Sequence, residues 1–236
     1  FAAQTQINLL LLRQFVSVLP MILAAGVLVY LQTRFRSRWK SVALLVLILL
    51  LPAVVKYNLP FWHPDGLVVL CVALTIYFLQ RDRWRFGHNF FLAALMCGLA
   101  SAIKLFGFFF FLSIAGYILT ALWQKKIVFR RASLVSVVFL VMMFGTIIFS
   151  NPFLFVSSAR ERLVWMMGLK ADEMKFGYDE PDPEQVYQKG FLATLPAIED
   201  AYALRALLVY GTLSMLFGFL KGKNCLVNGL LAGWVL

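Results

Sequence analysis

Uncharged stretches long enough to cross a lipid bilayer occupy most of this 236-residue chain. A transmembrane helix needs about 20 mostly apolar residues, and about 17 is the lower limit. Stretches without Asp, Glu, Lys or Arg span residues 14–33, 41–55, 66–80, 86–103, 105–124, 132–159, 206–220 and 224–236. Several reach the required length, and the shorter ones reach it with their basic and aromatic flanks. The pattern predicts an all-α, polytopic transmembrane bundle.

The composition agrees with this prediction. Hydrophobic residues make up 62% of the chain and charged residues only 14%, whereas an ordinary soluble domain has about 25% charged residues. Mean hydropathy is +0.83. We therefore expect an integral, multi-pass protein of the bacterial inner membrane, with membrane lipids as its surroundings.

The net charge of +11 comes from short loops between the apolar stretches. Thirteen of the 22 basic residues lie in four such loops: Arg34, Arg36, Arg38 and Lys40; Arg81, Arg83 and Arg85; Lys125, Lys126, Arg130 and Arg131; Lys221 and Lys223. Short loops rich in Lys and Arg stay on the cytoplasmic side. The alternate loops hold ten of the eleven acidic residues, and Asp82 is the exception. The basic charge thus indicates topology, and we expect no nucleic-acid partner.

The loops divide the chain into seven expected spans and a partial eighth within a single transmembrane domain, residues 1–236. The expected helices cover about 9–31, 41–55, 67–80, 89–104, 105–123, 132–149 and 201–220, and another begins at 224. The chain starts with Phe1 and stops inside an apolar run at Leu236. We therefore expect a piece of a longer protein.

Residues 150–200 form the one expected extracytoplasmic loop of substantial size. Ser158 and Glu161 have capping-box spacing for a helix start. Leu163, Val164, Met167 and Met174 are expected to form one apolar stripe, with charged residues on the other faces. This pattern predicts a helix lying in the membrane interface. The prolines of "DEPDP" (179–183) end it.

Asp65 stands at the mouth of an apolar run, in "FWHPDGLVV" (61–69). It follows Pro64 and precedes Gly66, which places it on a turn at a helix start. One interpretation is helix capping, in which the carboxylate accepts backbone N–H bonds and is favoured by the helix dipole. The other is an acidic group facing an outer cavity, where it binds a sugar hydroxyl or a metal or assists proton transfer. His63 either supports this group or only occupies the interface.

Lys104 is the most anomalous charge, because it lies in "ASAIKLFGFFFFL" with no acidic residue for more than fifty residues downstream. It is either a lysine that snorkels from an outer helix end or a cation that meets a lipid phosphate. Lys56 and Arg13 are expected at the same depth in the membrane as Lys104, so the sequence predicts a basic cluster that faces outward. Arg205 is a further candidate, although its place at a helix start favours snorkelling.

Other chemical motifs are lacking. The sequence has no Gly-rich phosphate loop, zinc-type His/Glu pair or nucleophile elbow. Cys71, Cys97 and Cys225 lie inside apolar stretches without metal-ligand spacing, so we interpret them as packing residues. No metal ligands are predicted, and dependence on a divalent metal stays open.

Several of these segments together resemble a known family. "LLLLRQFVSVLPMILAAGVLVYLQTR" resembles the span after the catalytic outer loop in polyprenyl-phosphate-dependent glycosyltransferases of the C superfamily. "LPAVVKYNLPFWHPDGLVVLCVALTIYFLQR" is similar to their next helical pair, and "NFFLAALMCGLASAIKLFGFFFFL" to their "Gly-Leu, small residues, Lys" stretch. "SNPFLF" is similar to an Asn-Pro-aromatic helix exit. The resemblance covers about residues 5–220 and is nearest to the protein-mannosyltransferase and aminoarabinose-transferase-like branches.

This resemblance implies an inverting transfer of a sugar from a polyprenyl-phosphate carrier to an acceptor at the extracytoplasmic face. The family's principal acid lies in the first outer loop, which would precede Phe1. On this basis Asp65 is a secondary catalytic acid and Lys104 meets the carrier phosphate. His63, Lys56 and Arg13 are the other expected substrate-binding residues.

Two other functions stay open at this point. A transporter or flippase of a lipid-linked substrate would use the same basic groups without a catalytic acid. A non-catalytic subunit of a larger membrane complex, with other membrane subunits as partners, would need none of them.

Overall fold

The computed structural model describes residues 2–58, 64–104, 110–176, 205–221, 226 and 228–230. All regular elements in these residues are helical, which confirms the all-α prediction for this part of the chain. The elements are α1 (Ala2–Arg13), η1 (Gln14–Val18), α2 (Leu19–Thr33), α3 (Arg38–Leu49), η2 (Ala53–Asn58), α4 (Asp65–Asp82), α5 (His88–Ile103), α6 (Phe111–Trp123), α7 (Phe129–Ser150), η4 (Pro152–Phe155), α8 (Ser157–Phe176) and α10 (Arg205–Leu220).

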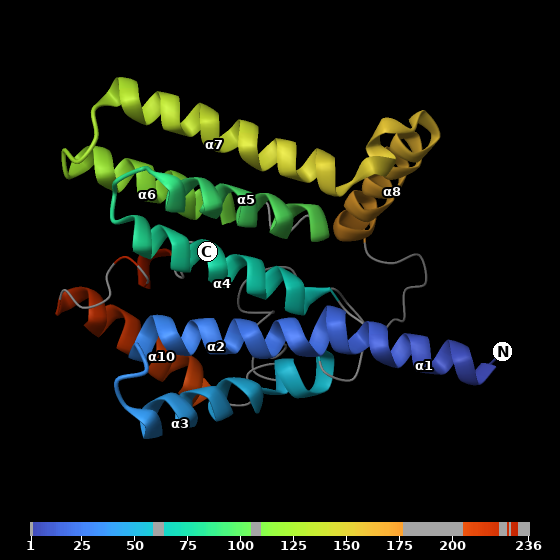
Figure 1. The fold of residues 1–236 in the computed structure, drawn as a ribbon, viewed down its shortest axis with the longest axis horizontal. Coiled ribbons are helices and arrows are strands. Elements are labelled where there is room, and N and C mark those ends of the chain that lie inside the picture. Colours follow the sequence, from blue (N-terminus) through green and yellow to red (C-terminus); the bar gives the residue numbers. More distant parts are fainter. Residues whose placement is uncertain are drawn as a thin grey trace.

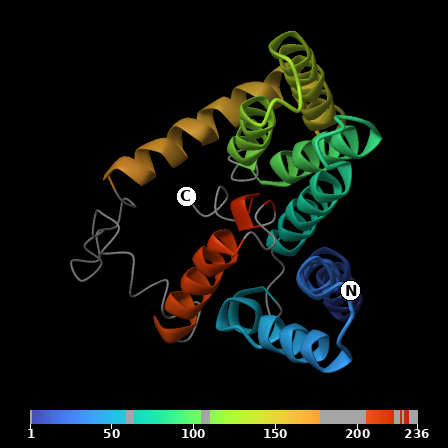
Figure 2. The same ribbon diagram turned by 90° about the vertical axis from the view of Figure 1, so that its left-hand side faces the viewer.

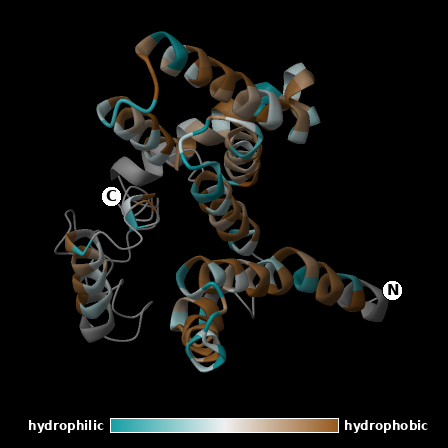
Figure 3. Ribbon diagram, turned by 60° about the vertical axis from the view of Figure 1, so that its left-hand side comes forward, coloured by the Kyte–Doolittle hydropathy of each residue, from teal (hydrophilic) through white to brown (hydrophobic). Residues whose placement is uncertain are grey.

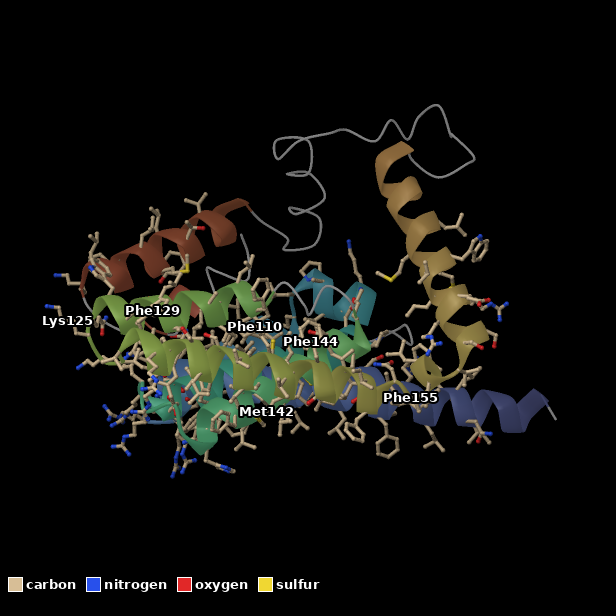
Figure 4. The ribbon with its side chains drawn as sticks, turned by 90° about the horizontal axis from the view of Figure 1, so that it is seen from above. Phe110, Lys125, Phe129, Met142, Phe144 and Phe155 are labelled. Carbon is tan, nitrogen blue, oxygen red and sulfur yellow. The ribbon has the colours of Figure 1, made fainter. Side chains whose placement is uncertain are left out.

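Most helices lie parallel or antiparallel to one another along the long axis of the molecule, so that the bundle has two ends (Figure 1). α2 and α4 pack side by side and run in the same direction, while α5 and α7 pack together in the opposite direction. α4 lies between α2 and α5. The basic turns at 34–37, 83–87 and 124–128 therefore gather at one end, which we call the basic end. Figure 4 shows many nitrogen-bearing side chains there, in the region of Lys125.

Small residues bring α5 close to α7. The buried face of α5 carries Ala93, Ala94, Cys97, Gly98, Ala100 and Ser101. A Cβ atom on Gly98 would lie 2.7 Å from the carbonyl oxygen of Met143 and 2.8 Å from Cβ of Thr146. Such close backbone approach is typical of helix pairs that gain stability from packing of small residues rather than from large side chains.

The outer faces of several helices are apolar and exposed. On α7, Leu134 is 61% exposed and Val141 66%. Figure 3 shows that the helices are mostly hydrophobic and that hydrophilic residues concentrate near the turns. Large exposed apolar surfaces of this kind mark contact with another protein or with a membrane.

Two of the described helical segments are long and apolar enough to cross a membrane, namely Ile7–Thr33 and Phe129–Ser150. α5 and α6 are apolar but shorter, at 16 and 13 residues. At about 1.5 Å per residue they fall short of the roughly 30 Å hydrocarbon core. The lengths of the described helices therefore do not establish seven spans.

α8 begins at Ser157, one residue before the predicted start, and lies across the axes of the bundle helices (Figure 2). The expectation of a single apolar stripe on it is wrong. Val164, Trp165, Met166 and Met167 are successive and all exposed, so apolar side chains go around the helix. Four consecutive helical positions span a whole turn and cannot share one face.

Asp82 is not a surface charge of a basic loop but the buried last residue of α4, only 2% exposed. Its carboxylate accepts hydrogen bonds from the backbone N–H of Phe86 (2.9 Å) and Gly87 (3.0 Å) and from the hydroxyl of Tyr117 (3.1 Å). The aspartate thereby joins the turn after α4 to α6. A buried carboxylate is tolerated where hydrogen bonds replace its hydration.

Candidate functional site at the start of α4

The site is built around the first turn of α4. Pro64 occupies the N-cap position, and Asp65 is the first helical residue. A carboxylate in the first turn is stabilised by the positive end of the helix dipole. The sequence correctly placed Asp65 at a helix start, although one residue inside the cap.

Gly66 fixes the position of this turn against the first helix. A Cβ atom on Gly66 would lie 2.5 Å from the carbonyl oxygen of Ser17, which is itself fully buried in η1. η1 is a π-helical segment that ends just before Leu19 and Pro20. π-helical turns inside α-helices occur frequently at functional sites. Only glycine lets the start of α4 lie this close to η1.

Lys104 reaches the same place from α5. It occupies the C-cap position of that helix in an extended conformation, and its N–H donates to the carbonyl oxygen of Ala100. Because α4 and α5 pack in opposite directions, the start of one lies beside the end of the other. A lysine is favoured at a helix C-terminus for the same reason that an aspartate is favoured at an N-terminus.

Lys104 and Asp65 form an ion pair. Lys104 Nζ donates to Asp65 Oδ1 at 2.7 Å, and the two side chains are 34% and 36% exposed. The acidic partner of Lys104, which was not evident from the sequence, is thus the upstream residue Asp65. Neither of the two interpretations of Lys104, snorkelling or phosphate binding, included this contact. A pair that is one-third exposed contributes about 0–1 kcal/mol to stability.

The other predicted residues are less closely tied to this pair. Arg13 is the last residue of α1, partly buried, and η1, which directly follows it, packs against α4. Lys56 is exposed in η2. His63 lies outside the described residues, and so does the side chain of Arg205. The structure thus brings two of the predicted residues, Asp65 and Lys104, into contact.

In the described part of the chain, no group of three or more His, Cys, Asp or Glu residues could hold a metal ion. Cys71 and Cys97 are buried in the core, as expected for packing residues. Among the described residues, the groups shown in contact at the start of α4 are the carboxylate of Asp65 and the ammonium of Lys104. Such a pair can bind hydroxyl and phosphate groups and can stabilise a developing negative charge.

Comparison with known proteins gives no relative for this chain. No protein-family model, curated protein or solved structure matches it.

Proposed function

We propose that this chain is part of an integral-membrane glycosyltransferase that transfers a sugar from a polyprenyl-phosphate carrier. The observation that carries the proposal is the Asp65–Lys104 ion pair, partly exposed at the end of the bundle opposite the basic turns. The sequence resemblance described above supplies the reaction. A transporter or flippase of a lipid-linked substrate would also use a cation at the position of Lys104.

The exposed side chains support a membrane location with several spans. Besides the apolar outer faces, large aromatic residues are exposed near both ends of the bundle. Trp39, at the start of α3, and Trp123, at the end of α6, lie next to the basic turns, and Phe149 lies at the far end of α7. Figure 4 shows Phe129 near the basic end and Phe155 toward the other end. Aromatic residues concentrate at the two membrane interfaces of transmembrane proteins. The basic turns would then face the cytoplasm and the ion pair the extracytoplasmic side.

In the proposed reaction, an acceptor nucleophile attacks the anomeric carbon of the sugar from the side opposite the carrier. The bond from that carbon to the carrier phosphate breaks, and its electron pair stays on the phosphate oxygen. Lys104 stabilises this charge, because a fixed cation near a developing anion lowers the barrier. The acceptor proton passes to a carboxylate that acts as the base, which in the family that the chain resembles belongs to the first outer loop.

Asp65 has two roles in this proposal. Before the carrier arrives it holds the ammonium of Lys104 in place at 2.7 Å. When a phosphate oxygen takes over the ammonium, the carboxylate is released to contact the sugar or the acceptor. A modest pair energy suits such an exchange, since a strong pair would compete with the phosphate.

The ion pair also fits a non-catalytic subunit, in which it would only fasten α4 to α5. Transfer by three variants separates the two functions: Asp65→Asn, Lys104→Met and the double variant. The measurement is release of polyprenyl phosphate from polyprenyl-phosphate sugars by purified full-length protein. For the enzyme we expect each single variant to lose about 30- to 1,000-fold in rate and the double variant to recover nothing. Lys104→Arg should keep partial activity.

A purely structural pair gives a different result. Removing both charges leaves neither member of this pair facing a lost partner, so the double variant would then retain more transfer than either single variant. Wild-type transfer by a folded Lys104→Met variant would also contradict the phosphate role.

A further inference from the structure

The turns after α2 and α4 present arginines at the same end of the bundle. α2 and α4 run in the same direction, and each is followed by an arginine in the left-handed conformation, Arg34 (φ 52°) and Arg83 (φ 50°). Glycine is the usual residue at this position because it adopts the conformation without strain. Both turns therefore carry a basic side chain where a glycine would suit the backbone better.

These turns line a polar pocket of about 360 Å³. Six of its lining residues are Arg34, Arg81, Arg83, Arg85, Tyr30 and Tyr77. None of the described residues that line it is acidic. The nearby carboxylate of Asp82 is buried and bonded to the backbone N–H of Phe86 and Gly87. The positive charge of the pocket thus lacks a counter-charge from its own walls.

Tyrosines hold two of the arginines in place. The guanidinium carbon of Arg34 lies 5.1 Å from the ring centroid of Tyr30, and Arg81 Nη1 donates to the hydroxyl of Tyr77 at 2.8 Å. The two rings are themselves 5.9 Å apart. Guanidinium groups fixed in this way bind phosphate oxygens with less loss of conformational freedom than mobile side chains.

Gln80 adds a hydrogen-bonding group to the same pocket. Its Oε1 atom is buried and has no hydrogen-bond partner among the described residues. A buried carbonyl oxygen requires a donor. A ligand that carries a hydroxyl beside its phosphate would supply one.

An apolar groove of about 380 Å³ lies next to this pocket, between α2 and α3. Its apolar walls include Gly26, Val29, Val42 and Leu45. Phe35 also lines the groove, and its ring lies 5.5 Å from that of Tyr30, which lines the basic pocket. The two rings form a shared wall, so a single molecule could place a charged head on one side and a hydrocarbon chain on the other.

We propose that the basic pocket and the α2–α3 groove together bind an anionic phospholipid, with its phosphate among the arginines and one acyl chain along the groove. A hydroxylated headgroup such as that of phosphatidylglycerol matches Gln80. Basic pockets between helices at the cytoplasmic surface are typical sites for anionic headgroups. The proposal depends on a membrane location but not on glycosyl transfer, since the carrier phosphate is assigned to the opposite end.

Titration of the purified full-length protein in neutral detergent with phosphatidylglycerol tests this proposal, with binding followed by native mass spectrometry. We expect Arg81→Gln/Arg85→Gln to bind the lipid about 30-fold more weakly, from the combined loss of two basic contacts. The matched control is Lys125→Gln/Lys126→Gln, which removes the same charge outside the pocket and should change binding by less than about threefold. Equal weakening by both variants would mean non-specific electrostatic attraction and would overturn the proposal.

A second variant separates a lipid from a free phosphate. A Cβ atom on Gly26 would meet nothing within 4 Å, so Gly26→Leu starts its side chain in open space, places bulk in the groove and improves helix propensity. Gly26→Leu should weaken phosphatidylglycerol binding about tenfold while the arginines stay intact. Phosphatidylcholine, inorganic phosphate and glycerol 3-phosphate should not compete. Unchanged lipid binding by Gly26→Leu, or full competition by inorganic phosphate, would rule out the lipid.

Discussion

The two aspartates of α4 stand at opposite ends of one helix and have opposite environments. Asp65, the first residue, is about one-third exposed and pairs with the flexible ammonium of Lys104. Asp82, the last residue, is 2% exposed and accepts bonds from two backbone N–H groups and a tyrosine hydroxyl. An aspartate at a helix C-terminus is opposed by the dipole, so its three donors must offset that cost. Asp65 has no such cost and can exchange partners.

This difference separates the carboxylate for which we propose a function, Asp65, from the structural carboxylate of Asp82 better than sequence context does. Both residues border apolar stretches, and both lie near arginines or lysines in the sequence. Rigid backbone donors and full burial characterise Asp82. Partial exposure and a lysine at the edge of the bundle characterise Asp65.

The largest expected effect is an all-or-none difference in thiol labelling between the two ends of α4. In a background without Cys71, Cys97 and Cys225, single cysteines at Ser37 and Gly87 should be protected from an impermeant thiol reagent in intact cells. Cysteines at Asn58 and Asp179 should be labelled. The physical reason is the retention of short basic loops in the cytoplasm. Labelling at Ser37 with protection at Asp179 would invert the topology and place Asp65 on the cytoplasmic side.

The next largest effect is expected at Asp82. Asp82→Ala leaves two backbone N–H groups without their acceptor in a buried site, and it leaves the hydroxyl of Tyr117 only the more distant carbonyl oxygen of Leu79 at 3.4 Å. We expect the free energy of unfolding to fall by about 3 kcal/mol or more. Asp82→Asn keeps one acceptor oxygen and should lose less. Thermal melting of the purified variants measures the difference, and a larger loss for Asp65→Ala than for Asp82→Ala would reverse the comparison.

A smaller loss of stability is expected from a substitution of Gly66, at the start of α4. Gly66→Ala forces the start of α4 away from Ser17, because the added Cβ would lie 2.5 Å from a backbone oxygen. We expect a loss of about 1–3 kcal/mol in stability and weaker transfer, as Asp65 moves with the turn. Gly145→Ala on α7 is the matched control, since its Cβ meets nothing within 4 Å. Equal melting temperatures for the two variants would show that the approach of α4 to η1 is loose.

The helices could be predicted from the sequence because their ends are marked by charge. α7, α5 and α4 begin within three residues of the positions that the uncharged stretches indicate. The helix expected over 41–55, with its end near Pro52 and Lys56, ends earlier, at Leu49, and η2 follows Pro52. The single apolar stripe expected on α8 was wrong because Trp165 and Met166, which lie between Val164 and Met167, are also apolar and exposed.

The contact between Asp65 and Lys104 could not be read from spacing alone, since they are far apart in the sequence. One signal was present: two adjacent helices of opposite direction, one beginning with an acid and the other ending with a base. The carboxylate partner of Lys104 lies upstream, at the start of the preceding helix. The bonds of Asp82 to Phe86 and Gly87 are local, but its burial depends on Tyr117 of α6, which is a tertiary contact.

The smallest expected effect concerns the stability of the ion pair itself. The variants Asp65→Asn, Lys104→Met and their combination form a double-mutant cycle, which isolates the energy of the contact from the other effects of each substitution. For a pair one-third exposed we expect a coupling of about 0.5–1 kcal/mol, measured by thermal melting in detergent. Lys104→Met leaves the Asp65 carboxylate without this ammonium, so it should destabilise slightly more than the double variant. A coupling above about 3 kcal/mol would make this pair as structural as the bonds of Asp82, because a lysine held that strongly could not exchange its carboxylate for a phosphate. A coupling below 1 kcal/mol together with a large loss of transfer would mean that the lysine acts on the substrate rather than on the fold.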